Sequence, residues 1–129
     1  MVILTIRTDK PEAEIGLYDD QRQLAYETWQ AHRQLAETLH SKIEALLKSQ
    51  KKKLTDVEGI LAFKGPGSFT GLRIGLTVAN ALSYSLQVPV VATGDRWIQE
   101  GIEDLLAGKG QKAVAPDYGG DAHITLPRK

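Results

Sequence analysis

Apolar residues in the first thirty positions follow the patterns of β-strands. Residues 2–6 form a nearly continuous run of β-branched and other apolar side chains, which is typical of a strand covered on both faces. Apolar and polar or small residues alternate over positions 13–17, and residues 24–29 form a third candidate strand. Three closely spaced strands predict an antiparallel meander at the start of a sheet.

The apolar period then lengthens to that of helices. Residues 33–49 form the clearest amphipathic helix, and further helices are predicted over residues 69–86 and from residue 97 to about Gly108. Thr93 or Asp95 is expected to cap the third helix. Two strands separate the helices, residues 59–63 and 88–92, and we expect them to be parallel because a whole helix joins them. Beyond residue 108, residues 113–115 and 124–126 are weak strand candidates, and the tail from Gly119 is expected to be mobile.

This order predicts an α/β fold with a mixed sheet flanked by helices. It fits the ribonuclease-H-like half-domain that is repeated in actin, hexokinase and Hsp70. At 129 residues, with 42% hydrophobic and 25% charged residues, the chain has the composition of one globular domain. Sixteen basic and sixteen acidic residues cancel, so no whole-chain field attracts nucleic acid or a membrane. Without cysteine the chain has no thiolate chemistry, and without a signal-peptide pattern or a long apolar run we expect a cytoplasmic protein.

A glycine-rich stretch, Gly-Pro-Gly-Ser-Phe-Thr-Gly-Leu-Arg-Ile-Gly at residues 65–75, lies between a strand and a helix. Such a turn can bind phosphate through free N–H groups at the helix start, yet both the dinucleotide and P-loop fingerprints fail on spacing. The alternative is packing, because Gly71, Gly75 and Ala79 form a bare stripe that lets another helix come close. We favour packing, with Ser68 or Thr70 as the cap of the helix. The weak candidates for binding a cofactor are Gly65, Gly67, Ser68, Thr70 and Arg73.

Other chemically active residues give weaker signals. His32, His40 and His123 lack metal-ligand spacing, so no metal site is predicted, and nothing in the sequence assembles Ser68, His32 and Asp117 into a triad. Arg73 is interpreted as a buried structural anchor rather than an anion ligand. Lysines at positions 48 and 51–53 form a basic cluster, which we interpret as a solvated helix end in preference to an RNA contact.

Taken whole, the eleven-residue string resembles the signature of the TsaB (YeaZ) family, bacterial proteins of threonylcarbamoyladenosine tRNA modification. The resemblance extends more weakly from Met1 to about Thr93. It implies an N-terminal actin-like lobe over residues 1–108 and a truncated remnant of a second lobe over residues 109–129. The family usually has Asp-Thr-Ser after the first strand, where this chain has Arg7, Thr8 and Asp9. Of the Asp-Ala-Arg that opens the family's second lobe, Asp117 alone matches.

The resemblance also implies a role without catalysis and without a cofactor. TsaB-like proteins pair with a catalytic paralogue, TsaD, through a bundle made of the first two helices of each lobe, and an ATPase, TsaE, joins them. This implies contact with tRNA only through the partners. The alternatives are a self-associating homodimer without a role in tRNA modification, and a reduced actin-like ATPase or phosphotransferase that uses the glycine-rich turn. The candidate interface residues on the two helices are Leu35, Leu39, Gly71, Leu72, Gly75, Leu76 and Ala79.

Overall fold

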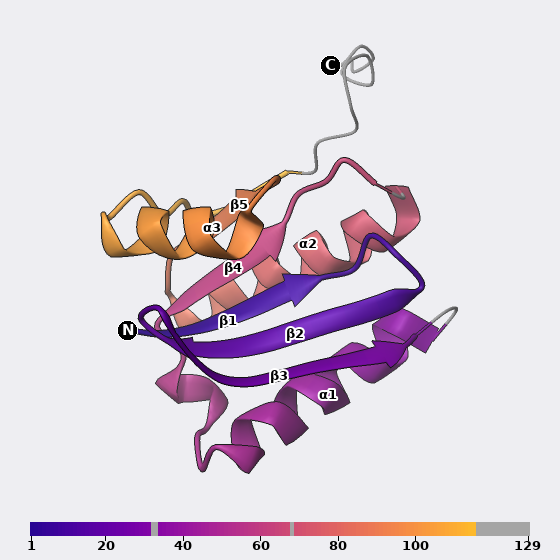
Figure 1. The fold of residues 1–129 in the computed structure, drawn as a ribbon, viewed down its shortest axis with the longest axis horizontal. Coiled ribbons are helices and arrows are strands. Elements are labelled where there is room, and N and C mark those ends of the chain that lie inside the picture. The colour runs from indigo at the N-terminus through magenta and orange to yellow at the C-terminus, as the bar shows by residue number, and fades with distance from the viewer. Residues whose placement is uncertain (32–33, 68, 116–129) are drawn as a thin grey trace.

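A five-stranded mixed sheet forms the centre of the molecule, with the strand order β3–β2–β1–β4–β5 (Figure 1). The computed structural model describes residues 1–31, 34–67 and 69–115. The strands are β1 (Val2–Arg7), β2 (Glu12–Asp19), β3 (Arg22–Gln30), β4 (Gly59–Phe63) and β5 (Val90–Thr93), and the helices are α1 (Leu35–Ser49), a short 3-10 helix η2 (Leu54–Asp56), α2 (Phe69–Leu86) and α3 (Trp97–Leu106).

The strand pairing confirms the predicted architecture. Strands β1, β2 and β3 form an antiparallel meander, in which Leu4 lies opposite Leu17. Strand β4 is parallel to β1, and β5 is parallel to β4. Strand β5 begins at Val90, two residues later than predicted. The reason is that Val88 bonds to α2 instead: its N–H donates to the Ser83 carbonyl and its carbonyl accepts from the Ser83 hydroxyl.

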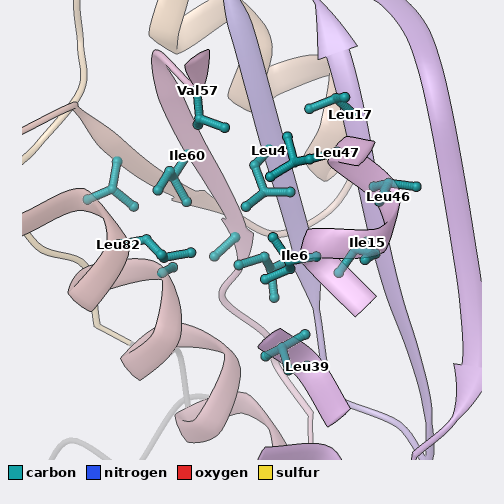
Figure 2. Packing of buried hydrophobic residues seen from close by; sticks show 14 of the residues in the cluster. Leu4, Ile6, Ile15, Leu17, Leu39, Leu46, Leu47, Val57, Ile60 and Leu82 are labelled. Carbon is teal, nitrogen blue, oxygen red and sulfur yellow. The ribbon is translucent and has the colours of Figure 1, made fainter. Parts of the chain in front are cut away.

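Helices α1 and α2 cover one face of the sheet. Figure 2 shows that Leu4, Ile6, Ile15 and Leu17 of the strands meet leucines of the helices in one apolar layer. This face is buried because the apolar stripe of each helix points at the sheet, as the helical period requires. The helix residues in this layer are Leu39, Ile43, Leu46, Leu47, Leu76, Ala79 and Leu82.

Helix α3 covers the opposite face over β4 and β5 (Figure 1). Gly101 lets it approach closely, since a Cβ there would overlap with the Leu61 side chain. The N-terminus of α3 is not capped as predicted. Its N-cap is Arg96, in the left-handed conformation (φ 53°) and without a side-chain cap bond, whereas the Thr93 hydroxyl donates to the Trp97 carbonyl.

The segment after α3 returns to the molecule without forming the predicted strand at residues 113–115. The side chain of Asn80 on α2 makes two hydrogen bonds to the backbone of Val114. Its amide nitrogen donates to the Val114 carbonyl at 2.9 Å, and its amide oxygen accepts from the Val114 N–H at 2.8 Å. An amide side chain offers the same donor and acceptor as a neighbouring strand. The predictions for residues 117, 119 and 124–126 fall outside the described residues.

Candidate functional site

The glycine stripe of α2 faces the chain's own β1–β2 connection. The Thr8 hydroxyl donates to the Gly71 carbonyl at 2.6 Å. A Cβ at Gly71 would overlap with the Thr8 carbonyl oxygen, and a Cβ at Gly75 would overlap with the Thr8 hydroxyl. The stripe therefore serves packing, but the neighbour is the end of β1 rather than the predicted second helix. Thr70 lies inside α2, so it is not the N-cap, and Ser68 falls outside the described residues.

The loop that leads into α2 packs against the same connection. Gly65 is buried and has a φ of 106°, a backbone conformation that glycine adopts readily. Gly67 lies against Asp9, where a Cβ would come within 2.7 Å of the aspartate Cβ. Residues 7–9 thus meet the distant glycine-rich stretch, at residues 65–67 and 71–75, near the carboxyl ends of β1 and β4.

A charged pair occupies this end of the sheet. Arg7 donates to both carboxylate oxygens of Asp9, at 2.8 and 3.3 Å, and its guanidinium lies 3.9 Å above the centre of the Phe63 ring. Burial lowers the pKa of Arg7, but the hydrogen bonds and charge of Asp9 outweigh it, so the pKa lies above its usual value. Trp97 packs edge-on against Phe63, with ring centres 6.0 Å apart.

These residues do not fit a nucleotide phosphate with its metal ion. A depression of about 350 Å³ is lined by Arg7, Phe63, Gly65, Trp97 and their neighbours. The half-buried guanidinium of Arg7 is already neutralised by Asp9, so a phosphate that approached it would have to displace a bidentate carboxylate. Arg96, the other cation of the lining, is exposed and lies next to Asp95 in the same lining. A carboxylate that binds a guanidinium with both oxygens is equally unsuited to hold Mg²⁺.

The weak cofactor candidates are not brought together. Gly65 and Gly67 lie beside the Arg7–Asp9 pair, whereas Arg73 is exposed on the outer side of α2. The prediction that Arg73 is a buried anchor was wrong, because it lines a groove between α1 and α2. Within the described residues, no three His, Cys, Asp or Glu side chains gather into a metal-binding group. His40 lies on α1 at the same groove, and the predictions for His32, Ser68, Asp117 and His123 fall outside the described residues.

The predicted interface residues face the interior instead of a partner. Leu39, Leu72 and Ala79 are fully buried, and Leu35 and Leu76 are at most 6% exposed. Gly71 and Gly75 pack on Thr8. A partner could not reach these side chains without separating the helices from the sheet, so this assignment is corrected.

On their outward faces, α1 and α2 leave a shallow groove between them that a partner could reach. It has a volume of about 330 Å³. Ile74 and Val78 are half-buried in it, and Ala36, His40, Arg73 and Thr77 are exposed. Sequence reasoning missed this surface because it followed the strongest apolar stripe. The available signal was the small and apolar residues, such as Ala36 and Ile74, on the sides of the helices away from that stripe.

Comparison with known proteins places the chain in a family. Residues 29–93, half of the chain, match the family model described as "TsaD: tRNA N6-adenosine threonylcarbamoyltransferase". The tRNA threonylcarbamoyladenosine biosynthesis protein TsaB of Escherichia coli is 30% identical over 96 residues, which cover 70% of this chain and 39% of that relative. The chain belongs to the family of tRNA threonylcarbamoyladenosine proteins that this model describes, and within it to the TsaB (YeaZ) proteins. The predicted resemblance is therefore confirmed.

Solved structures support the same placement and the fold. YeaZ from Pseudomonas aeruginosa superposes with a TM-score of 0.67 and 30% identity, covering 72% of this chain and 43% of that one. RuvC of Thermus thermophilus, solved with a Holliday junction substrate, has a TM-score of 0.54 at 15% identity and covers 92% of this chain and 85% of that one. At this identity RuvC shows the fold alone, which is ribonuclease-H-like as predicted.

The chain spans about two fifths of the length of these TsaB and YeaZ relatives. In the described part of the chain, every helix is too short or too polar to cross a membrane.

Proposed function

We propose that the chain acts in threonylcarbamoyladenosine modification of tRNA as a non-catalytic subunit that binds and activates a TsaD-type transferase. The observation that carries this proposal is the groove between the outward faces of α1 and α2. Ile74 and Val78 pack partly against the core and leave part of their surface in the groove, beside the exposed Ala36 and Thr77. A helix pair that leaves such a groove open can accept the helices of a second protein.

The Arg7–Asp9 pair supports a role without catalysis. It fills the end of the sheet with a neutralised ion pair, so a reduced ATPase or phosphotransferase is the weaker hypothesis. In the proposed complex, the transferase supplies the catalytic residues, a TsaE-type ATPase joins it, and tRNA is the common substrate.

The proposed domain organisation is one actin-like lobe over residues 1–108, followed by a remnant of a second lobe. The coverage of 85% of RuvC supports a lobe-sized unit. Residues 110–114 pack back onto it through Gln111, which bonds to Val90, and through Val114.

The test is the light-scattering mass of the chain, alone and mixed with the TsaD-type protein of the same organism. We expect a mixed complex that Thr77→Glu abolishes, because Thr77 is exposed in the groove and a carboxylate there would be desolvated against the partner. Gln99→Glu is the matched control, since Gln99 is exposed on α3 at the opposite face of the sheet. A homodimer that ignores the transferase, or equal loss of binding by both variants, would contradict the proposal.

A further inference from the structure

Four lysines gather where α1 ends: Lys48, Lys51, Lys52 and Lys53. Lys48, Lys52 and Lys53 line one depression of about 530 Å³, and Glu44 is its one acidic lining residue. The charges of the whole chain cancel, so these four cations leave the remaining residues with a net charge of −4. The chain thus has a strongly basic spot on an otherwise acidic molecule.

The backbone under these lysines is fixed by hydrogen bonds at both ends. Lys51 has a φ of 58°, its N–H donates to the Lys48 carbonyl, and the N–H of Lys52 donates to the Leu47 carbonyl at 2.9 Å. This is the Schellman arrangement that closes helices, with lysine at the position that favours glycine. Beyond it, the N–H of Lys53 donates to the Asp56 carboxylate at 2.8 Å, at the start of η2. The lysines therefore project from a defined turn.

The fold itself makes little use of their charges. Among the described residues, the lysines in ion pairs are Lys10 and Lys42, and none of the four is paired. The negative end of the helix dipole accounts for a cation in the last turn, which is Lys48. Lys51, Lys52 and Lys53 lie past that turn, where the effect of the dipole falls off.

The sequence alone favoured a solvated helix end, but the fixed turn and the absence of ion pairs at these lysines among the described residues favour a ligand. We propose that this lysine cluster binds the phosphate backbone of a structured RNA. The inference rests on the proposed function, since it supplies a direct contact to the tRNA on which the complex acts. Point charges on flexible stems bind phosphates without reading sequence. RNA is favoured over a lipid surface because Leu47 is buried and Leu54 is half-buried, which leaves the cluster without an exposed apolar anchor.

The cluster and the helix groove are separate surfaces of the same helix. Lys48 lies eight residues beyond His40 on α1, about 12 Å along the helix axis. RNA can therefore lie across the end of α1 while a partner occupies the groove.

The test measures fluorescence anisotropy of an unmodified tRNA transcript with the complex of this chain and its TsaD-type partner, and also with this chain alone. For Lys52→Gln/Lys53→Gln we expect about tenfold weaker binding at 0.1 M salt and a salt dependence, in log–log form, that is shallower by about two. Lys109→Gln/Lys112→Gln removes the same charge at exposed positions elsewhere and should change little. Equal effects of the two variants, or none from the first, would overturn the inference.

Two further measurements separate the explanations. Lys51→Gly suits the left-handed backbone, so we expect a higher melting temperature together with about twofold to threefold weaker RNA binding. Polyglutamate that competes as strongly as RNA would assign the cluster to an acidic protein and refute an RNA site. The light-scattering mass of each sample reports the partner complex independently. An intact complex with unchanged tRNA affinity would refute this inference alone, whereas tRNA binding by the chain without a complex would refute the proposed function alone.

Discussion

Gly75 has no room for a side chain. A Cβ there would overlap with the Thr8 side chain, and Thr8 is 3% exposed. We predict that Gly75→Ala lowers the free energy of unfolding by about 2–3 kcal/mol, measured by urea denaturation. Thr77→Ala, on the exposed side of the same helix, is the control and should stay within about 0.5 kcal/mol. An unchanged midpoint for Gly75→Ala would show that the β1–β2 connection moves aside easily. Gly75 is thus unsuited to testing a partner interface, because its replacement disturbs the fold first.

Tyr26 gives a pH dependence in the alkaline range. Burial, followed by the hydrogen bond to Glu14 and the charge of Glu14, raises the pKa of Tyr26 far above its ordinary value of 10.0. The hydroxyl donates to Glu14 Oε1 at 2.6 Å. The folded state therefore keeps a proton that the unfolded state releases above pH 10, so stability is fully present below that pH and falls as the pH rises.

Above pH 10, the free energy of unfolding is expected to fall by less than about 1.4 kcal/mol per pH unit, the limit for one proton, because solvent screens the half-buried ring. It is measured by urea denaturation at a series of pH values above 10. Tyr26→Phe should flatten the decline, while Tyr84→Phe should not, because Tyr84 is 78% exposed. Parallel declines in the wild type and Tyr26→Phe would assign the effect to other groups.

At the scale of elements, one side chain of α2 makes the hydrogen bonds to the C-terminal segment at Val114, where apolar packing also contributes. Asn80 makes both hydrogen bonds to Val114. Asn80→Ala is expected to cost about 1–2 kcal/mol and to release this segment locally, so that the Val114 amide exchanges hydrogen much faster. Ala81→Ser, on an exposed position of α2, serves as the control. Slow exchange at Val114 in Asn80→Ala would mean that its side-chain packing holds the segment without the amide.

Hydrophobic periodicity predicted the elements because each one buries a whole face. The limits of β4 (Gly59–Phe63) and α2 (Phe69–Leu86) agree with the prediction, since glycine and proline mark them in the sequence. Capping and short pairings were predicted less well. Thr93 bonds to a carbonyl rather than to a free N–H, and Val114 is bound by a side chain 34 positions away. Such contacts depend on tertiary placement, which a local pattern does not contain.

The same periodicity misplaced the candidate interface. An apolar stripe on a helix marks the face that is buried first, and here the sheet occupies it. The groove that remains, with Ala36 and Ile74, has too few apolar residues to stand out beside the leucine stripe. The charged end of the sheet was also invisible in the sequence, because a neighbouring arginine and aspartate indicate a bidentate pair only once the chain bends at Thr8.

For the whole molecule, the proposed association uses exposed side chains that the core does not need. The core uses the inner faces of α1 and α2, whereas Ala36 and Thr77 in the groove and the four lysines lie outside it. Substitutions at the exposed groove positions should therefore change partner affinity without changing the melting temperature, whereas substitutions at Ile74 or Val78 should change both. In the proposed complex, the groove between α1 and α2 would hold the transferase while the lysine cluster at the end of α1 would hold the RNA.

The position of β1 between β2 and β4 has a consequence for synthesis on the ribosome. Its antiparallel neighbour β2 is made immediately afterwards, but its parallel neighbour β4 begins at Gly59, after the whole of α1. During that interval the nascent meander has an open, strongly apolar edge at residues 3–6, which can pair with other chains. This edge of β1 is therefore covered only when residues 59–63 have been made, and a chaperone that shields residues 3–6 until then would protect the nascent chain from pairing with other chains.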